Sequence, residues 1–435
     1  MAAYIEPRVL KGFRDFLPSA EIARKDLVEK IEKSFRSFGF VPIDTPVLEY
    51  AEILLGKSGG DTEKQVYRFK DHGDRDVALR FDLTVPFARF VAEHRQEIPL
   101  PFKRYHIAKV WRGEITQRGR YREFTQCDFD IVGSDNAAAD FEILLMMRKT
   151  ISCLGAGEVA IHLNHRGLFN RFLSRLGVLE KSADILRTVD KLAKIGREET
   201  LKLLAESAGA GKAREILNYI EIRGTFDETL EALNAAAVGP GGGFCPEAER
   251  LALIRRFMIE TGIEGAFTLD PSITRGLDYY TGIVYETFLT DMPELGSVCS
   301  GGRYNNLTGL YLKEAVPGVG SSIGIDRLIA GLESLGRLSS RPTYADLAIA
   351  CTGEKNTGAA QALAEKLRKA GVLCEVFLEE DKLPKQFMLA EKKGIKWIVI
   401  PGEDPLKDSF TLRDLVKREN REGVSSDEIR VRFMF

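Results

Sequence analysis

Apolar residues in the first third of the chain follow helical and strand periodicities in turn. From Ile22 to Phe35 they recur every three or four residues, which predicts a helix over 20–38 that Gly39 would end. Residues 40–50 then alternate like a strand, although their prolines fit a sheet edge or an interface better than a sheet centre. The same patterns predict further strands over 77–81, 103–112, 127–132, 264–269, 282–290 and 297–300, and helices over 137–153 and about 320–335.

Two later stretches depart from this mixed pattern. Residues 168–255 are rich in Ala, Leu, Glu, Lys and Arg, carry few strand signals and include the glycine-rich segment 239–244, so we predict a helical insertion. Residues 336–344 have the composition of a linker. Strand-like and helical segments alternate beyond them, which predicts a small α/β domain over 345–435.

Composition and charge bound the class of protein. A chain of 435 residues exceeds what one hydrophobic core supports, and 44% hydrophobic with 29% charged residues is ordinary for a globular protein. The net charge of −2 leaves a nucleic-acid partner open, because such binding depends on a local basic face. No apolar run reaches the roughly 18 residues that span a membrane, and the N-terminal segment is charged where a signal peptide is apolar, so we expect a cytoplasmic protein.

The cysteine and histidine residues do not predict a metal site. The six cysteines are far apart and form no CxxC pair, so we interpret them as reduced thiols. His162 and His165 have no acidic or thiol partner at ligand spacing, which favours a structural or hydrogen-bonding role. We therefore expect no metal held by protein ligands.

Residues 110–133 carry the densest set of polar side chains at strand-like spacing. Arg112 and Glu114 lie two apart and so share a strand face, as do Gln126, Asp128 and Asp130. The loop between them adds three arginines, at positions 118, 120 and 122. A buried charge cluster of this kind is costly unless its members pair with each other or with a ligand. The implied hairpin is therefore either a solvated, salt-bridged surface or part of a ligand site.

Three further segments combine glycine with polar or aromatic residues. They are 273–286, with Arg275, Tyr279 and Tyr280; 296–309, with Gly301 and Gly302; and 318–333, a glycine-rich strand that becomes a helix carrying Arg327. A Gly-Gly pair lets a ligand approach the backbone, but by itself it is usually a turn, and a tyrosine pair is usually core. No one of these segments settles the function alone.

Together the segments resemble the motifs of class II aminoacyl-tRNA synthetases, and of the histidyl-tRNA synthetase family in particular. The stretch from Arg112 and Glu114 to Phe124 resembles motif 2, Asp326-Arg327 resembles motif 3, and Pro46 resembles the motif 1 proline at the dimer interface. Four segments are similar to stretches typical of the histidyl family: KGFRDFLP (11–18), LRFDLTVPFARF (79–90), RGLDYYTG (275–282) and SGGRYNNLTG (300–309).

The resemblance implies an α+β fold, with an antiparallel sheet flanked by helices, in a homodimer. Residues 1–167 and 256–335 would be the two parts of the catalytic core, and the helical insertion over 168–255 would clamp the tRNA acceptor stem. Residues 345–435 would form an α/β anticodon-binding domain. The implied reaction joins histidine to ATP, giving histidyl-adenylate and pyrophosphate, and then transfers histidine to the 3′ end of histidine tRNA. Mg²⁺ would bridge the ATP phosphates.

The resemblance also implies roles for individual residues. Arg112 and Arg275 would be catalytic, holding the histidine carboxylate and the α-phosphate, because a planar guanidinium grips either group at two points. ATP would also contact Glu114, Arg120, Phe124 and Arg327. Histidine would contact Asp82, Leu83, Thr84, Gln126, Asp130, Tyr279, Tyr280, Gly301 and Gly302. The hairpin tip, with Gln117, Arg118 and Arg122, would meet the acceptor end of the tRNA.

Two other functions fit parts of the pattern. The regulatory subunit of ATP phosphoribosyltransferase has a similar catalytic domain and binds histidine, but it charges no tRNA. It typically lacks the anticodon domain and motif arginines, whereas this chain has Arg112, Arg275, Arg327 and the C-terminal region. A synthetase for another amino acid, such as threonine or proline, is disfavoured by residues 278–280 and 300–306.

Overall fold

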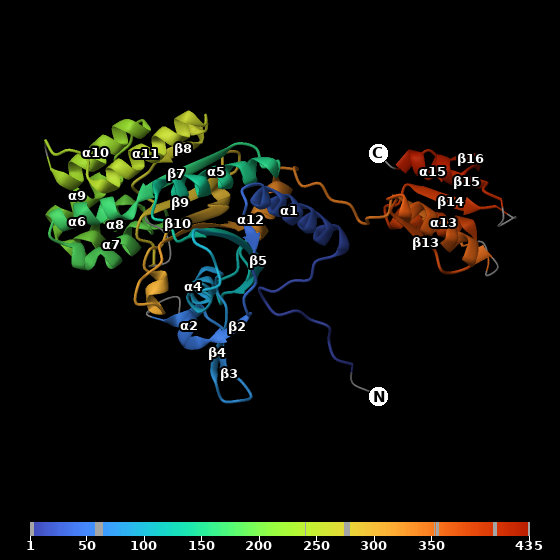
Figure 1. The fold of residues 1–435 in the computed structure, drawn as a ribbon, viewed down its shortest axis with the longest axis horizontal. Coiled ribbons are helices and arrows are strands. Elements are labelled where there is room, and N and C mark those ends of the chain that lie inside the picture. Colours follow the sequence, from blue (N-terminus) through green and yellow to red (C-terminus); the bar gives the residue numbers. More distant parts are fainter. Residues whose placement is uncertain are drawn as a thin grey trace. The chain divides into compact units, whose positions relative to one another are not determined.

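The computed structural model describes residues 4–56, 64–239, 241–273, 279–351, 353, 356–402 and 407–433. The chain forms two units, one of Met1–Asp15 with Leu27–Leu338 and one of Phe16–Asp26 with Ser339–Phe435 (Figure 1). Each unit has its own sheet and its own hydrophobic clusters. The predicted α+β fold is confirmed.

The larger unit is built on an eight-stranded sheet in the order β1-β5-β6-β11-β10-β9-β7-β8. Its strands are β1 (Val41–Pro42), β5 (Phe102–Trp111), β6 (Glu123–Val132), β7 (Val159–His165), β8 (Phe267–Leu269), β9 (Ile283–Leu289), β10 (Cys299–Arg303) and β11 (Gly318–Gly324). Neighbouring strands are antiparallel except in the two edge pairs, β1 with β5 and β7 with β8. Strands β6 and β11, which are far apart in the sequence, are thus neighbours in the interior of the sheet.

Strand periodicity gives the centre of this sheet an apolar face and a polar face. Tyr105 on β5 and Phe129 on β6 pack on Phe35 of α1 (Pro18–Ser37), with ring centroids 5.6 Å and 4.8 Å from that of Phe35. Helix α5 (Ala137–Cys153) contributes its buried residues to the same core cluster. Asp128 and Asp130 alternate with Phe129 and so point to the opposite face. The polar site forms on that face.

The predicted strand over 40–50 is wrong as a single element. Val41–Pro42 forms β1 in the main sheet, whereas Leu48–Tyr50 forms β2 in a separate three-stranded sheet of order β2-β4-β3. Pro46 lies between them and has no N–H to continue a ladder, so the chain changes sheet there. The small sheet is completed by β3 (Arg68–Lys70) and β4 (Asp76–Leu79) and packs near α2 (Ala51–Leu55) and α4 (Thr84–Glu93).

Six helices follow β7 and group at one end of the larger unit (green to yellow in Figure 1). This helical group consists of α6 (Arg166–Arg175), α7 (Ser182–Val189), α8 (Leu192–Ala208), α9 (Ala210–Ile220), α10 (Phe226–Val238) and α11 (Pro246–Glu260). Local signals fix some of their ends: Thr225 and Glu228 form a capping box at the start of α10. The helices occupy the region predicted to be the insertion, and the boundaries 168–255 stay a prediction.

Two other predicted elements have different bounds. The predicted strand over 264–269 begins as a short 3₁₀ turn (Glu264–Ala266), and only β8 is extended. The predicted helix over 320–335 begins at Ile325, as α12 (Ile325–Ser334), because the residues before it are paired in β11 with both β6 and β10. Two more 3₁₀ turns (Pro293–Leu295 and Leu307–Leu310) flank β10, and another (Leu179–Lys181) precedes α7.

The smaller unit contains a five-stranded sheet in the order β13-β12-β14-β15-β16. Its elements are β12 (Leu347–Ile349), α13 (Thr357–Lys369), β13 (Cys374–Val376), α14 (Leu383–Lys392), β14 (Trp397–Pro401), β15 (Phe410–Asp414), β16 (Glu419–Val424) and α15 (Ser426–Phe433). Strands and helices alternate up to β14, as the sequence pattern predicts, but the last three elements do not continue the alternation of strand and helix. Residues 419–423 of β16 are exposed and polar or glycine, so no apolar alternation reveals that strand.

Candidate active site

The polar face of the main sheet lines two adjoining cavities. The first has a volume of about 480 Å³ and is lined by eight residues that were predicted to contact histidine or its carboxylate: Asp82, Thr84, Arg112, Gln126, Asp130, Tyr279, Tyr280 and Gly301. The second, of about 390 Å³, is lined by five residues that were predicted to contact ATP: Arg112, Glu114, Arg120, Phe124 and Arg327. Arg112, Gln126 and Ser322 line both, so the two cavities share a wall.

Three other predicted ligand contacts are not in this lining. Arg275 lies outside the described residues. Leu83 is fully buried at the start of α4, and Gly302 is buried behind Tyr280. A Cβ atom at Gly302 would lie 2.9 Å from Cδ1 of Tyr280 and 2.5 Å from the carbonyl oxygen of Ile283. Gly302 therefore leaves room for the tyrosine ring.

Asp82 sits where the chain turns from the small sheet into α4. Its Oδ1 accepts a hydrogen bond of 3.1 Å from the backbone N–H of Val85, in the first turn of that helix. The side chain is 1% exposed, and burial raises its pKa to about 6, although Arg112 and Arg104 act in the other direction. A cation beside Asp82 would therefore be strongly favoured.

Asp130 lies on β6 between two partners that the sequence analysis did not identify. Its Oδ1 accepts a 2.5 Å hydrogen bond from the Tyr304 hydroxyl, and Nη2 of Arg104 lies 2.7 Å from its Oδ2. Arg104 is fully buried and stacks over Phe87 at 4.0 Å. Burial still raises the pKa of Asp130. Both oxygens are thus held in a fixed orientation at the cavity wall.

Asp128 shares the strand face of Asp130 but was given no role in the sequence analysis. It is 1% exposed, and its Oδ1 has no hydrogen-bond partner among the described residues. Burial raises its pKa to about 7, opposed by Arg104 and reinforced by Asp130. The two-residue spacing from Asp130 could have indicated that Asp128 is buried beside the site, because both lie on one face of a buried strand.

Glycines on β10 and β11 leave no room for side chains at two positions in the cavity wall. A Cβ atom at Gly301 of β10 would lie 2.1 Å from the carbonyl oxygen of Gly320. At Gly320 of β11 a Cβ atom would lie 1.8 Å from Oδ1 of Asp130. No side chain fits at either position, so the Asp130 carboxylate packs directly on the backbone of β11.

Arg112 links the two cavities. Its Nε donates to the carbonyl oxygen of Phe81 at 2.8 Å, and the guanidinium lies 5.2 Å from the ring centroid of Phe124. Glu114 lies 3.7 Å from Arg112 and 3.6 Å from Arg120. The arginines are thereby ordered while their side chains remain about a third exposed or less. This arrangement suits recognition of a carboxylate or phosphate.

Asp326 connects three segments that are far apart in the sequence. One of its oxygens accepts a 2.8 Å hydrogen bond from the N–H of Thr125 on β6, and the other pairs with Arg14. Arg14 also lies 3.7 Å from the ring centroid of Tyr121 in the hairpin. Next to Asp326, Arg327 donates to the carbonyl oxygen of Ser297 at 2.6 Å. Arg14 thus braces the wall of the second cavity from the N-terminal segment.

The three residues predicted to meet tRNA lie on the hairpin outside both cavities. The backbone of Gln117 pairs with that of Arg120 across the tip. Arg118 bonds to Ser334 at the end of α12. Nε of Arg122 donates to the carbonyl oxygen of Glu114 at 3.3 Å. The structure groups the three on one loop, and their role stays a prediction.

The helical group also lines the cavities, which the sequence analysis did not foresee. Leu186, Arg187 and Lys191 contribute to the first cavity, Lys194 contributes to the second, and Asp190 contributes to both. These residues lie more than 50 positions from the motif segments before and after them, and no short motif marks them.

The two histidines considered as metal ligands lie in other settings. Nδ1 of His162 hydrogen-bonds to Oδ2 of Asp270 at 2.8 Å. His165 is buried, which lowers its pKa to about 4. Among the described residues, no group of three His, Cys, Asp or Glu side chains is placed to hold a metal ion. No helix in the described part of the chain has both the length and the apolar character to cross a bilayer.

Comparison with known proteins shows which family the chain resembles. The family described as "Histidyl-tRNA synthetase" matches residues 12–328, and the family described as "Anticodon binding domain" matches residues 346–431. A "Histidine--tRNA ligase" of Treponema denticola is 50% identical over 99% of this chain and 98% of its own length. The crystal structure of a histidyl-tRNA synthetase from Nostoc sp. PCC 7120 superposes with a TM-score of 0.86 at 31% identity, over 99% of this chain and 100% of that one.

A third comparison concerns the regulatory alternative. A Bacillus halodurans structure described as an ATP phosphoribosyltransferase regulatory subunit/histidyl-tRNA synthetase has a TM-score of 0.74 at 21% identity, over 89% of this chain and 97% of that one. At that identity the likeness shows the fold alone. The full-length relative at 50% identity and the family match over the whole catalytic region carry more weight. This chain therefore belongs to the histidyl-tRNA synthetase family.

Proposed function

We propose that the protein is a histidine–tRNA ligase, which makes histidyl-adenylate from histidine and ATP and then transfers histidine to its tRNA. The observation that carries this proposal is the pair of adjoining cavities that meet at Arg112. The first is walled by carboxylates and tyrosines suited to an amino acid with a basic side chain. The second contains Arg120, Phe124 and Arg327, which suit a nucleotide with its phosphates.

In the first step, a histidine carboxylate oxygen attacks the α-phosphorus of ATP and pyrophosphate leaves. Negative charge grows on the phosphoryl oxygens, so the protein acts by positioning and by electrostatic stabilisation. Arg112 stands at the shared wall, where carboxylate and α-phosphate would meet, and we assign Arg275 to the same pair of groups. In the second step, a terminal ribose hydroxyl of the tRNA attacks the carbonyl carbon and AMP leaves.

Histidine would be recognised by its two nitrogen-containing groups. Asp82, Thr84 and Gln126 would receive the ammonium. Burial raises the pKa of Asp82, and a cation beside this carboxylate would favour its charged form. Asp130 and Tyr280 would read the ring nitrogens, with Tyr279 beside them. A site that pairs both ring nitrogens rejects apolar amino acids strongly, because its own polar groups would be left unpaired.

Mg²⁺ would enter with ATP. Three acidic side chains line the second cavity. Glu114 and Asp326 are already paired with Arg112, Arg120 and Arg14, and Asp190 belongs to the helical group. We therefore assign the ion's ligands to phosphate oxygens and water, which is common for Mg²⁺ at nucleotide sites. When bound, the ion neutralises charge on the phosphates.

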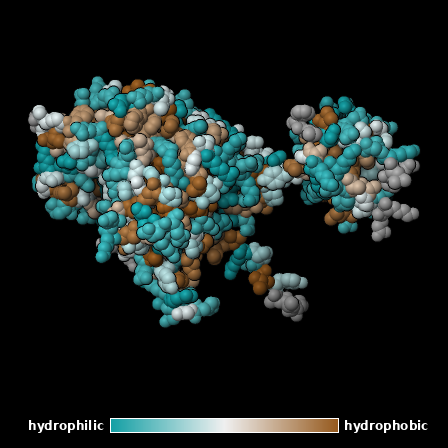
Figure 2. Space-filling model, in the orientation of Figure 1, coloured by the Kyte–Doolittle hydropathy of each residue, from teal (hydrophilic) through white to brown (hydrophobic). Residues whose placement is uncertain are grey.

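The remaining partners are a second copy of this chain and tRNA in the cytoplasm. Apolar residues near Pro46 support the homodimer: Val41, Val47, Leu48 and Tyr50 are each 39–49% exposed. Figure 2 shows that hydrophobic residues (brown) interrupt the hydrophilic surface of the larger unit. For tRNA, we assign the acceptor end to the hairpin tip and the helical insertion, and the anticodon to residues 346–431.

An exchange assay tests this function. The purified protein should catalyse histidine-dependent exchange between ATP and pyrophosphate, and none of the other nineteen amino acids should replace histidine. Arg112→Ala should lower the exchange rate about 10²–10³-fold, the range for removing a preorganised donor at a reacting oxygen. Arg68→Ala, on exposed β3, is the control and should leave the rate unchanged. A protein that binds histidine but shows no exchange would instead be a histidine-sensing regulatory subunit.

A further inference from the structure

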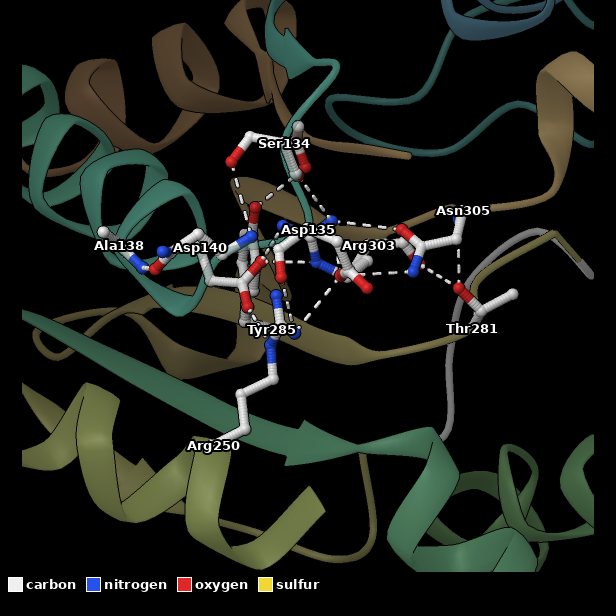
Figure 3. A network of polar contacts seen from close by, with 11 residues as sticks. Ser134, Asp135, Ala138, Asp140, Arg250, Thr281, Tyr285, Arg303 and Asn305 are labelled. Atoms are coloured by element: carbon white, nitrogen blue, oxygen red, sulfur yellow. Dashed lines mark hydrogen bonds and ion pairs between the residues drawn. The ribbon is translucent and has the colours of Figure 1, made fainter. Parts of the chain in front are cut away.

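One carboxylate ties the helical group to the histidine cavity. Asp140, in the first turn of α5, is fully buried. Its Oδ1 accepts a 2.7 Å hydrogen bond from Nε of Arg303 on β10, and its Oδ2 accepts a 2.6 Å hydrogen bond from Nε of Arg250 on α11 (Figure 3). This buried carboxylate thus adds a charged link between the main sheet and the helical group.

Arg303 passes this restraint on to the histidine signature. Its Nη1 donates to Asn305 Oδ1 at 3.0 Å, and its own carbonyl oxygen accepts a 2.8 Å hydrogen bond from the N–H of Thr281. The N–H of Asn305 donates to the Thr281 hydroxyl at 3.1 Å. Thr281 directly follows Tyr280, which lines the first cavity. The arginine therefore fixes the backbone that carries Tyr280.

Charge in this cluster balances only while Arg250 is present. Arg250 and Arg303 each lie 3.2 Å from Oδ1 of Asp135, so two guanidinium groups face two carboxylates. His165, which lies beside the cluster, adds no charge near neutral pH because burial lowers its pKa to about 4. Removing Arg250 takes the charged donor from Oδ2 of the buried Asp140 and leaves Arg303 as the arginine that pairs with both carboxylates. A buried acceptor that loses its donor is costly.

We propose that Arg250 is a positioning residue, through which the helical group holds the Tyr279–Thr281 segment in register with the histidine cavity. The proposal rests on the assignment of that cavity to histidine. The ligand that Arg250 affects is histidine, through the contacts to its ring and ammonium group that are assigned above.

The chain offers a matched pair of arginines for the test. Arg250 and Arg255 lie on the same helix, and both side chains are 19% exposed. Arg255 pairs at 3.7 Å with Asp227 of α10 and stacks on Phe226 at 5.1 Å, so its contacts stay within the helical group. Arg250→Met should weaken histidine binding about tenfold in calorimetric titration and leave ATP affinity within twofold. Arg250→Lys should recover part of the loss, and Arg255→Met should bind histidine like the parent.

Each outcome decides one question. Equal histidine affinity in Arg250→Met and Arg255→Met overturns the proposal, even if both variants melt at a lower temperature. A loss of ATP and histidine affinity together in Arg250→Met also overturns it, because that would be a general structural defect. Failure of the parent protein to bind histidine overturns both this proposal and the proposed function. Binding without exchange overturns only the ligase assignment.

Discussion

At the residue scale, three carboxylates that interact with one another are buried on the polar face of the main sheet. Asp82, Asp128 and Asp130 are each 1–2% exposed, and Arg104, which pairs with Asp130, is the fully buried cation among them. The pKa of Asp82 rises to about 6 and that of Asp128 to about 7 because burial penalises their charged forms. A histidine ammonium beside Asp82, which lines the first cavity, would favour the charged form of that carboxylate.

The Asp128 pKa makes stability depend on pH. Because this pKa is raised from 3.8 to about 7, the folded protein keeps a proton that the unfolded chain releases. The resulting stability is fully present below about pH 4 and is lost as the pH rises through 7. Asp128→Asn removes this dependence. The free energy of unfolding of the variant, relative to that of the parent, should therefore rise by roughly 1–3 kcal/mol from pH 5 to pH 8.

Urea denaturation of both proteins at the two pH values, without ligand, measures this difference. Asp74→Asn, at an exposed position, is the control for the loss of one carboxylate. A parent-to-variant difference that is the same at pH 5 and pH 8 would show that Asp128 titrates outside this interval.

At the scale of elements, the sequence predicts what is local and misses what depends on pairing. The two-residue spacing correctly set Gln126, Asp128 and Asp130 on one strand face. It could not reveal Arg104 opposite Asp130, because that contact depends on the register between β5 and β6. The Arg14–Asp326 pair joins residues 312 positions apart, and β16 shows no apolar alternation. The resemblance to the family's motifs predicted that the cavity residues come together. The periodicity of apolar residues carries no such information.

Strand β11 allows a test of how closely it packs against β6 at Asp130. Gly320→Ala should cost about 3 kcal/mol or more in stability, or abolish histidine binding, because its Cβ would lie 1.8 Å from Asp130 Oδ1 and 2.9 Å from the carbonyl oxygen of Phe129. Gly324→Ala on the same strand meets only the carbonyl oxygen of Val298 at 3.8 Å and should stay within about 1 kcal/mol of the parent. Thermal unfolding and histidine titration of both variants give the answer, and equal behaviour would mean that the strands can separate to admit a side chain.

At the scale of the whole molecule, the two units divide the work. Every residue that lines the two cavities lies between 82 and 327, within the larger unit. The smaller unit, which matches the anticodon-binding family, has its own hydrophobic clusters on the two faces of its sheet, one with α13 and one with α14. The response of each unit to a cavity ligand can therefore be measured separately without cutting the chain.

The two tryptophans make that separation measurable. Trp111 lies on β5 in the larger unit, and Trp397 lies on β14 in the smaller one. Trp397→Phe leaves a reporter of the larger unit only, and Trp111→Phe leaves a reporter of the smaller unit only. Histidine at 100 times its dissociation constant should stabilise the unit that binds it by about 2.7 kcal/mol. The fluorescence melting transition of Trp397→Phe should therefore rise by several degrees on adding histidine, while that of Trp111→Phe stays in place. Since ligand binding acts only on the cooperative unit that contains the site, an equal rise in both variants would show that the two units unfold together.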